Sequence, residues 1–191
     1  MRLSQLSSAL ALALLASTAA QAQQFSSVVS FGDSLTDAGN VGTLQGLPAG
    51  SSFTTNPDPT YAQALSQLLG LGPQTNNSPL IAGTSAGTNY AYGGACAISN
   101  GTVTAGGAFV CVNSPANFSV QTQFGTHLAA HGGAADPNAL YTYWAGANDL
   151  FTAAGKGAAA ASMAAQAGLT AVGQIKALQA AGANNIVVFN M

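Results

Sequence analysis

Short runs of apolar and aromatic residues alternate with longer amphipathic or polar stretches along this chain. Runs of this length are typical of strands buried in a parallel sheet. The predicted strands span residues 27–31, 87–92, 140–145 and 186–190. Apolar residues at helical spacing between the runs predict helices. The predicted helices span residues 60–69, 121–131 and 156–181, and residues 96–119 are expected to form a loop or a small hairpin.

Helix-breaking residues mark the ends of these elements. Pro59 precedes the first predicted helix, Gly70 stops it, and Gly182 closes the long Ala-rich helix. Residues 40–56 are rich in Gly, Ser and Thr, which predicts a loop. Strands that alternate with helices imply a parallel sheet with helical crossovers, so the sequence predicts an α/β fold.

The first 22 residues have the pattern of an export signal. Arg2 supplies the positive start, residues 9–16 are apolar, and Ala20-Gln21-Ala22 is a small-residue cleavage site. The apolar stretch is too short to span a bilayer, and we find no later stretch suited to a transmembrane helix. We expect a signal peptide at residues 1–22 and one domain at residues 23–191. An apolar terminus with no targeting role is the alternative.

Charge is scarce, since only 4% of the residues carry one. Without the signal, two lysines and five aspartates leave a net charge of −3. A chain of this kind lacks the basic surface that nucleic-acid binding needs, so that class of partner is excluded.

The two cysteines, Cys96 and Cys111, are candidates for a disulfide in an exported chain. A bridge over so short a loop stabilises a fold by roughly 3 kcal/mol. Two separate buried thiols are the alternative. The cysteine spacing and the lack of further ligands argue against a metal site, and we expect no cofactor.

Three polar segments follow predicted strands, where a parallel sheet collects its chemistry in one crevice. They are residues 32–35 (Gly-Asp-Ser-Leu), residues 89–95 (Asn-Tyr-Ala-Tyr-Gly-Gly-Ala) and residues 146–149 (Gly-Ala-Asn-Asp). Acyl transfer needs a nucleophile and hydrogen-bond donors for the developing oxyanion. Ser34 offers the hydroxyl, the Gly-Gly turn lets a backbone N–H approach a substrate, and the Asn148 amide offers a further donor.

These segments resemble the three blocks of the GDSL or SGNH hydrolase family, in its exported bacterial lipase/esterase branch, which includes autotransporter esterases. The first block extends through residues 31–40, and the resemblance covers residues 25–191. It implies a flavodoxin-like three-layer sandwich around a parallel sheet. It also implies that Ser34 is the nucleophile and that the oxyanion hole consists of the Ser34 N–H, the Gly94 N–H and Asn148. Gly93 is the alternative to Gly94.

The family's late Asp-x-x-His block, which carries the base and its orienting aspartate, has no counterpart in these residues, and the family's last strand is also missing. The resemblance implies hydrolysis of lipid or short acyl esters through an acyl-enzyme on Ser34, weak or absent in this incomplete domain. The resemblance also implies a location in the periplasm, on the outer-membrane surface or outside the cell, with anchoring through a missing carboxy-terminal region left open. The rival functions are a non-catalytic acyl- or glycan-binding remnant and a Gly/Ala-rich surface protein without a site.

Structural roles remain as alternatives for the polar residues. Ser34, Asp33 and Asp37 could cap a helix, and Asn148 could be a turn residue. For Asp149 we favour a structural role over a catalytic one.

Two further groups of residues are expected to be structural. His127 and His131 lie four apart without the Glu of a metal-binding H-E-x-x-H motif, so we expect a solvated helix face. Tyr141, Tyr143 and Trp144 are expected in the core and the crevice wall.

Overall fold

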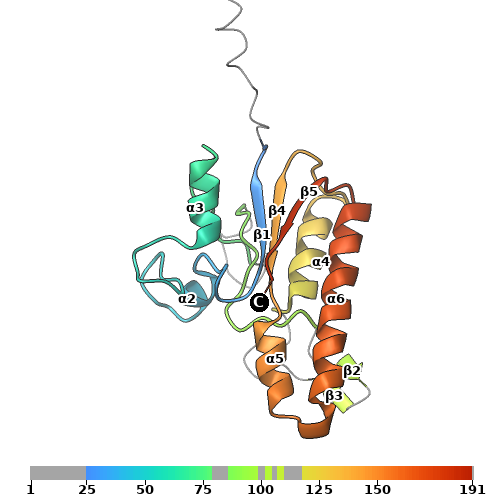
Figure 1. The fold of residues 1–191 in the computed structure, drawn as a ribbon. Helices are drawn as coiled ribbons and strands as arrows, with labels where there is room; N and C mark the ends of the chain where they lie inside the picture. Colours follow the sequence, from blue (N-terminus) through green and yellow to red (C-terminus); the bar gives the residue numbers. More distant parts are fainter. Residues whose placement is uncertain (1–24, 79–85, 99–101, 105–106, 110–117, 191) are drawn as a thin grey trace, which may run out of the picture.

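Three parallel strands form the central sheet of the computed structural model, which describes residues 25–78, 86–98, 102–104, 107–109 and 118–190. Their order is β1 (Val28–Gly32), β4 (Leu140–Trp144) and β5 (Asn185–Val188). Figure 1 shows α3 (Tyr61–Leu68) on one side of the sheet, with α4 (Val120–Ala130) and α6 (Ala160–Ala180) on the other. This layered arrangement confirms the predicted α/β fold class.

The predicted strand at residues 87–92 is an extended segment beside β1 rather than a regular strand. Ser30 N–H donates to the Thr88 carbonyl at 2.9 Å, and the N–H groups of Tyr90 and Tyr92 donate to Ser30 and Gly32. On its other side, Asn89 hydrogen-bonds the backbone of residues 75 and 77. The segment therefore covers the edge of β1 that β4 leaves open.

Several elements depart from the predicted boundaries. The short helix α2 (Asn40–Leu44) lies in the predicted loop, and α5 (Ala147–Ala154) directly follows β4. Before the helix predicted at 156–181, residues Gly157–Ala159 form a 3₁₀ turn, and α6 begins only at Ala160. The φ of Gly157 is +54°, outside the right-handed helical region, so the α-helix does not extend back to residue 156. Within residues 96–119, β2 (Thr102–Thr104) and β3 (Gly107–Phe109) pair antiparallel, so the small hairpin is confirmed.

The core lies between β1, β4 and α4. Phe31 is fully buried, and its ring centroid lies 4.2 Å from that of Phe124. His127 joins this aromatic group and is only 3% exposed, so the expected solvated face is wrong for His127, whereas His131 is exposed. Among the helices of the described residues, none combines the length and the apolar character that crossing a membrane requires.

Candidate active site

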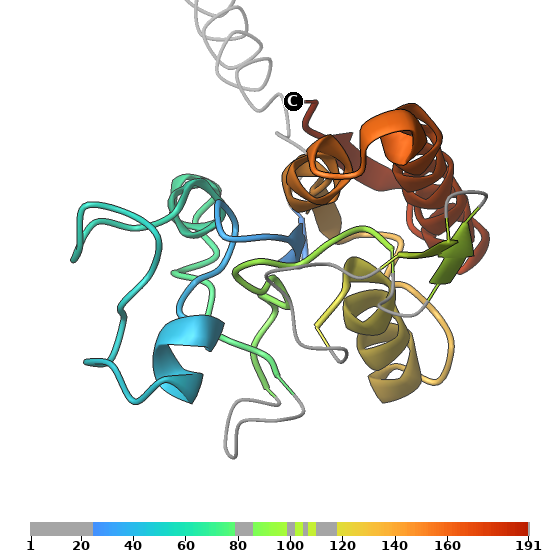
Figure 2. The ribbon, with the colours of Figure 1, turned by 90° about the horizontal axis from the view of Figure 1, so that it is seen from below.

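Hydrogen bonds connect the first two polar segments, the end of β4 and the third segment that follows it, at the carboxyl edge of the sheet. Asp33 N–H donates to the Trp144 carbonyl at 3.2 Å, and Tyr92 N–H donates to the Gly32 carbonyl at 3.1 Å. The Asn148 amide closes the triangle by donating to the Ala95 carbonyl at 2.9 Å. Figure 2 looks onto this edge, with α2 on one side and α5 on the other. The structure therefore brings together the segments that carry Ser34, Gly94 and Asn148.

Ser34 lies in the turn that leaves β1, and its side chain is partly exposed. Nothing among the described residues hydrogen-bonds its hydroxyl. The first N–H groups of α2 are instead accepted by Asp37, which makes Asp37 the cap and leaves the capping alternative for Ser34 without support. A partly exposed serine in a fixed turn is accessible to a substrate.

The Gly-Gly turn has a conformation that only glycines fit. Gly94 has a φ of +81°, in the left-handed region. A Cβ on Gly93 would lie 2.4 Å from the Phe53 ring and 2.9 Å from Val41. The Gly93 N–H donates to Asp37 Oδ2 at 2.9 Å, so it is already engaged within the protein. This contact argues against Gly93 as the oxyanion donor.

Asn148 and Asp149 occupy the first turn of α5 and have different partners. Asn148 is 8% exposed, and an amide nitrogen has two hydrogens, so the bond to Ala95 leaves one hydrogen for a substrate oxygen. Asp149 is fully buried and accepts the N–H groups of Ala97 and Ile98 at 2.8 and 3.3 Å. Asp149 therefore anchors the loop after the Gly-Gly turn, which supports its structural interpretation.

Asp33 directly precedes Ser34 and is 2% exposed. Burial raises the pKa of its carboxyl from 3.8 to about 6, and the nearby Asp149 carboxylate acts in the same direction. The Leu35 N–H, which donates to Asp33 Oδ1 at 3.2 Å, opposes that pKa shift. Because Asp33 turns inward to meet the backbone, its role in the described residues is to shape the turn that carries Ser34.

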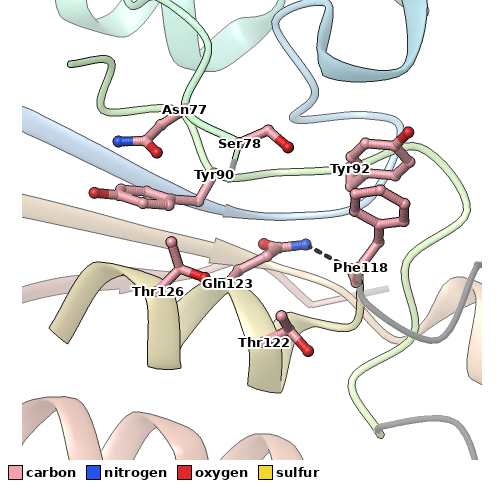
Figure 3. A pocket seen from close by; sticks show the side chains of 8 residues that line it. All are labelled: Asn77, Ser78, Tyr90, Tyr92, Phe118, Thr122, Gln123 and Thr126. Carbon is pink, nitrogen blue, oxygen red and sulfur yellow. Dashed lines mark hydrogen bonds between the residues drawn. The ribbon is translucent and has the colours of Figure 1, made fainter. Parts of the chain in front are cut away.

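Sequence reasoning missed Gln123, which holds the last residue of β1 from the facing helix α4. Its Oε1 accepts the Gly32 N–H at 2.9 Å, and its Nε2 donates to the Gly32 carbonyl at 2.8 Å. Figure 3 shows the same amide donating to Phe118, whose ring stacks on Tyr92 at 3.6 Å. No local signal reveals this role, because Gln123 and Gly32 are 91 residues apart.

The cavity in Figure 3 is not a substrate site. It lies beneath Tyr90 and Tyr92 and has a volume of about 10 Å³, roughly the space of one water molecule. Neither Ser34 nor Asn148 is among the residues that line it. The position of the candidate site therefore rests on the three joined segments rather than on this cavity.

Neither histidine is hydrogen-bonded to Ser34 in the described part of the chain. His127 Nδ1 lies 3.3 Å from the Tyr90 hydroxyl, and burial among aromatic rings lowers its pKa from 6.5 to about 4. His131 Nδ1 lies 2.7 Å from the His127 carbonyl. No group of three or more potential metal-ligating side chains occurs among the described residues.

The remaining candidates are structural where the structure describes them. Tyr141 and Tyr143 are core residues, and Trp144 packs against Tyr61 and Phe189, in agreement with the predicted core and wall positions. Cys96 takes part in a disulfide, and its predicted partner Cys111 lies outside the described residues.

Comparison with known proteins gives two matches. The family model for GDSL-like Lipase/Acylhydrolase matches residues 28–191. A curated protein named "Lipase 1", from Photorhabdus luminescens, is 32% identical over 179 residues. That alignment covers 93% of this chain but only 24% of the relative, so the chain spans about a quarter of the relative's length.

Proposed function

The chain belongs to the GDSL-like lipase/acylhydrolase family, and from this premise we propose that it is the esterase part of an exported serine hydrolase. Ser34 attacks the carbonyl carbon of a carboxylic ester, forms an acyl-enzyme and passes the acyl group to water. The substrates are lipid or short acyl esters. Residues 1–22 act as the export signal, and residues 23–191 belong to the hydrolase domain.

The observation that carries this proposal is the triangle of hydrogen bonds among the first two blocks, the end of β4 and the third block that follows it. It supports the proposal because the turn of Ser34 lies beside the segments of Gly94 and Asn148, the residues that we propose as donors to a tetrahedral oxyanion. The oxyanion hole consists of the Ser34 N–H, the Gly94 N–H and the free hydrogen of Asn148 Nδ2. Fixed donors of this kind cost no reorganisation during the reaction.

A general base is the component that the described site lacks. The 191 residues contain no Asp-x-x-His sequence, and His127 on α4 and His131 at its carboxyl end have partners of their own. Without a base a serine hydroxyl is a weak nucleophile near neutral pH, and only the residual catalysis from the oxyanion hole and binding remains. We therefore propose that turnover by these residues alone is weak.

The lack of a general base in the described site is also compatible with a second function, ligand binding without catalysis. A fold that holds an ester or glycan over Ser34 without a base would be a binding module. Such a module predicts saturable binding of acyl or glycan ligands with no covalent adduct.

The test is hydrolysis of p-nitrophenyl butyrate by the purified protein and by Ser34→Ala, each with and without added imidazole as an external base. We expect slow turnover that imidazole increases in the native protein beyond its background effect in Ser34→Ala, with a butyryl group on Ser34 by mass spectrometry. Equal rates in both proteins and no adduct would contradict the esterase proposal. Retained binding of the ester under those conditions would favour the binding module.

A further inference from the structure

Asp37 is a fully buried carboxylate, three residues after Ser34, that the proposed chemistry does not use. Its Oδ1 accepts the N–H groups of Gly39 and Asn40, at 2.8 Å for Gly39. Its Oδ2 accepts the N–H groups of Val41 and Gly93, at 3.1 and 2.9 Å. All the acceptor capacity that a carboxylate normally uses is thereby taken up by backbone donors.

Three of these four donors belong to the start of α2, but the fourth comes from the second block. The cap of α2 would be complete with Gly39, Asn40 and Val41 alone. The bond to Gly93 adds a connection over 56 residues of sequence. A buried carboxylate with charge-assisted hydrogen bonds is a strong anchor, because breaking one leaves a charged group less compensated.

The Gly93 bond bears directly on the neighbouring Gly94. Asp37 holds Gly93 from one side, while on the other a Cβ would lie 2.4 Å from the Phe53 ring and 2.9 Å from Val41. The Gly93 N–H belongs to the Tyr92–Gly93 peptide, so this bond holds the residue from which the next peptide, with the Gly94 N–H, extends. Asp37 itself is fixed to the turn that contains Ser34.

We propose that Asp37 is a positioning residue for the oxyanion hole, which holds the Gly93–Gly94 peptide in register with the Ser34 turn. This inference rests on the proposed esterase function for its catalytic consequence. Asp37 does not touch the substrate; it acts through Gly93. The effect on catalysis therefore depends on one hydrogen bond rather than on the cap of α2.

Other contacts keep the second block in place when Asp37 is altered. Asn40 Nδ2 donates to the carbonyls of Asn89 and Ala91 at 3.0 and 2.8 Å, and Asn89 Nδ2 donates to the Thr36 carbonyl at 2.8 Å. These bonds hold residues 89–91, upstream of the Gly-Gly turn. Loss of the Asp37 carboxylate is therefore expected to loosen residues 93–94 while the segment stays docked.

The first test compares Asp37→Asn with Gln74→Ala in p-nitrophenyl butyrate hydrolysis. An amide has one acceptor oxygen and meets the remaining N–H donors with its own N–H₂ group. We expect Asp37→Asn to lower kcat about 10- to 100-fold with KM changed less than about threefold, since the lost contact serves the transition state. Gln74 is also buried and hydrogen-bonds Val28, Ser30, Thr88 and Asn89, none of which belongs to residues 93–94. Gln74→Ala should therefore lower stability without that loss of kcat.

The second test needs no turnover. Amide hydrogen exchange, followed by NMR, should show faster exchange at Gly93 and Gly94 in Asp37→Ala than in the native protein, with residues 89–91 still protected. Gln74→Ala should not single out these two glycines. Unchanged exchange at Gly93 and Gly94 in Asp37→Ala, or an unchanged kcat in Asp37→Asn, would overturn the positioning role. Turnover that survives in Ser34→Ala would instead overturn the proposed function, and the exchange data would still decide the role of Asp37.

Discussion

The outer strands of the sheet, β1 and β5, differ in how far their surroundings enclose them. All five residues of β1 are buried, whereas Val187 and Val188 of β5 are 40% and 49% exposed. β1 lies between β4 and the extended segment 87–92, with α3 and α4 against its faces. Among the described residues, β5 pairs with β4 alone.

This difference makes the end of β1 a suitable place for the proposed nucleophile, Ser34. A strand that is bonded on both edges and packed on both faces has little freedom at its last residue, so the turn after it is held in one geometry. Preorganised donors and nucleophiles need such a fixed frame. If enclosure matters, a substitution in or against β1 should lower the free energy of unfolding much more than a matched substitution at an exposed position.

The largest effect is expected for Phe31→Ala in β1. The ring is fully buried against Phe124, Tyr90 and His127, so its removal leaves a cavity and should lower the free energy of unfolding by about 3–5 kcal/mol. Phe151→Ala removes the same ring from a position that is 70% exposed and should change stability by less than about 0.5 kcal/mol. Urea unfolding measures the free energy of unfolding of both variants. Similar losses in the two would mean that the enclosure of β1 adds nothing to stability.

The next effect is expected for Gln123→Ala on α4. The substitution leaves the buried Gly32 N–H without its partner and should lower the free energy of unfolding by roughly 2–4 kcal/mol. Gln121→Ala, on the exposed side of the same helix, is the matched control and should be nearly neutral. If the two variants unfold alike in urea, α4 does not fix the end of β1.

Features that depend on neighbouring residues could be predicted from the sequence, whereas features that depend on contacts between distant residues could not. β1, β4 and β5 lie within one or two residues of their predicted limits, because each depends on a run of apolar residues. Ser34 and Asn148 could be identified from the sequence as candidate site residues, since each lies in a contiguous motif; their roles stay predictions. The helix α2 could not be predicted, because its first turn depends on the buried Asp37 carboxylate rather than on its own composition.

Burial of polar side chains was equally hidden in the sequence. Gln123 and His127 lie on α4 and are buried, whereas Gln121 on the same helix and His131 at its C-cap are exposed, and nothing local separates the members of each pair. Their contacts with β1 decide which of them is buried. Roles that depend on such distant contacts require the fold.

A smaller effect is expected in the pH dependence of stability, where Asp33 and His127 act in opposite directions. The folded pKa of Asp33 is about 6, above 3.8, so its contribution to stability is full below pH 3.8 and is lost as the pH rises to about 6. The folded pKa of His127 is about 4, below 6.5, so stability is lost as the pH falls from 6.5 to about 4. The two effects largely cancel in the native protein.

Single substitutions should separate these two effects. Asp33→Asn removes the Asp33 effect, so between pH 6.5 and pH 4 its stability should fall by roughly 2–3 kcal/mol relative to the native protein. His127→Phe removes the loss at low pH, so its stability should rise relative to the native protein over the same fall in pH. Urea unfolding at several pH values gives the slopes, and equal slopes in the two variants would contradict the assignment.

The smallest effect is expected for Val188→Thr on β5, a substitution that exchanges a methyl group for a hydroxyl with little change in shape. Because Val188 is 49% exposed, water can solvate the new hydroxyl, and the free energy of unfolding should change by less than about 0.5 kcal/mol. Val28→Thr makes the same change in β1 at 1% exposure and should cost about 1–3 kcal/mol, because the hydroxyl is taken out of water. Equal losses for both variants would mean that β5 is covered in solution, for instance by a second copy of the chain. A dependence of the Val188→Thr loss on protein concentration would then identify that assembly, because only an association between copies makes stability depend on concentration.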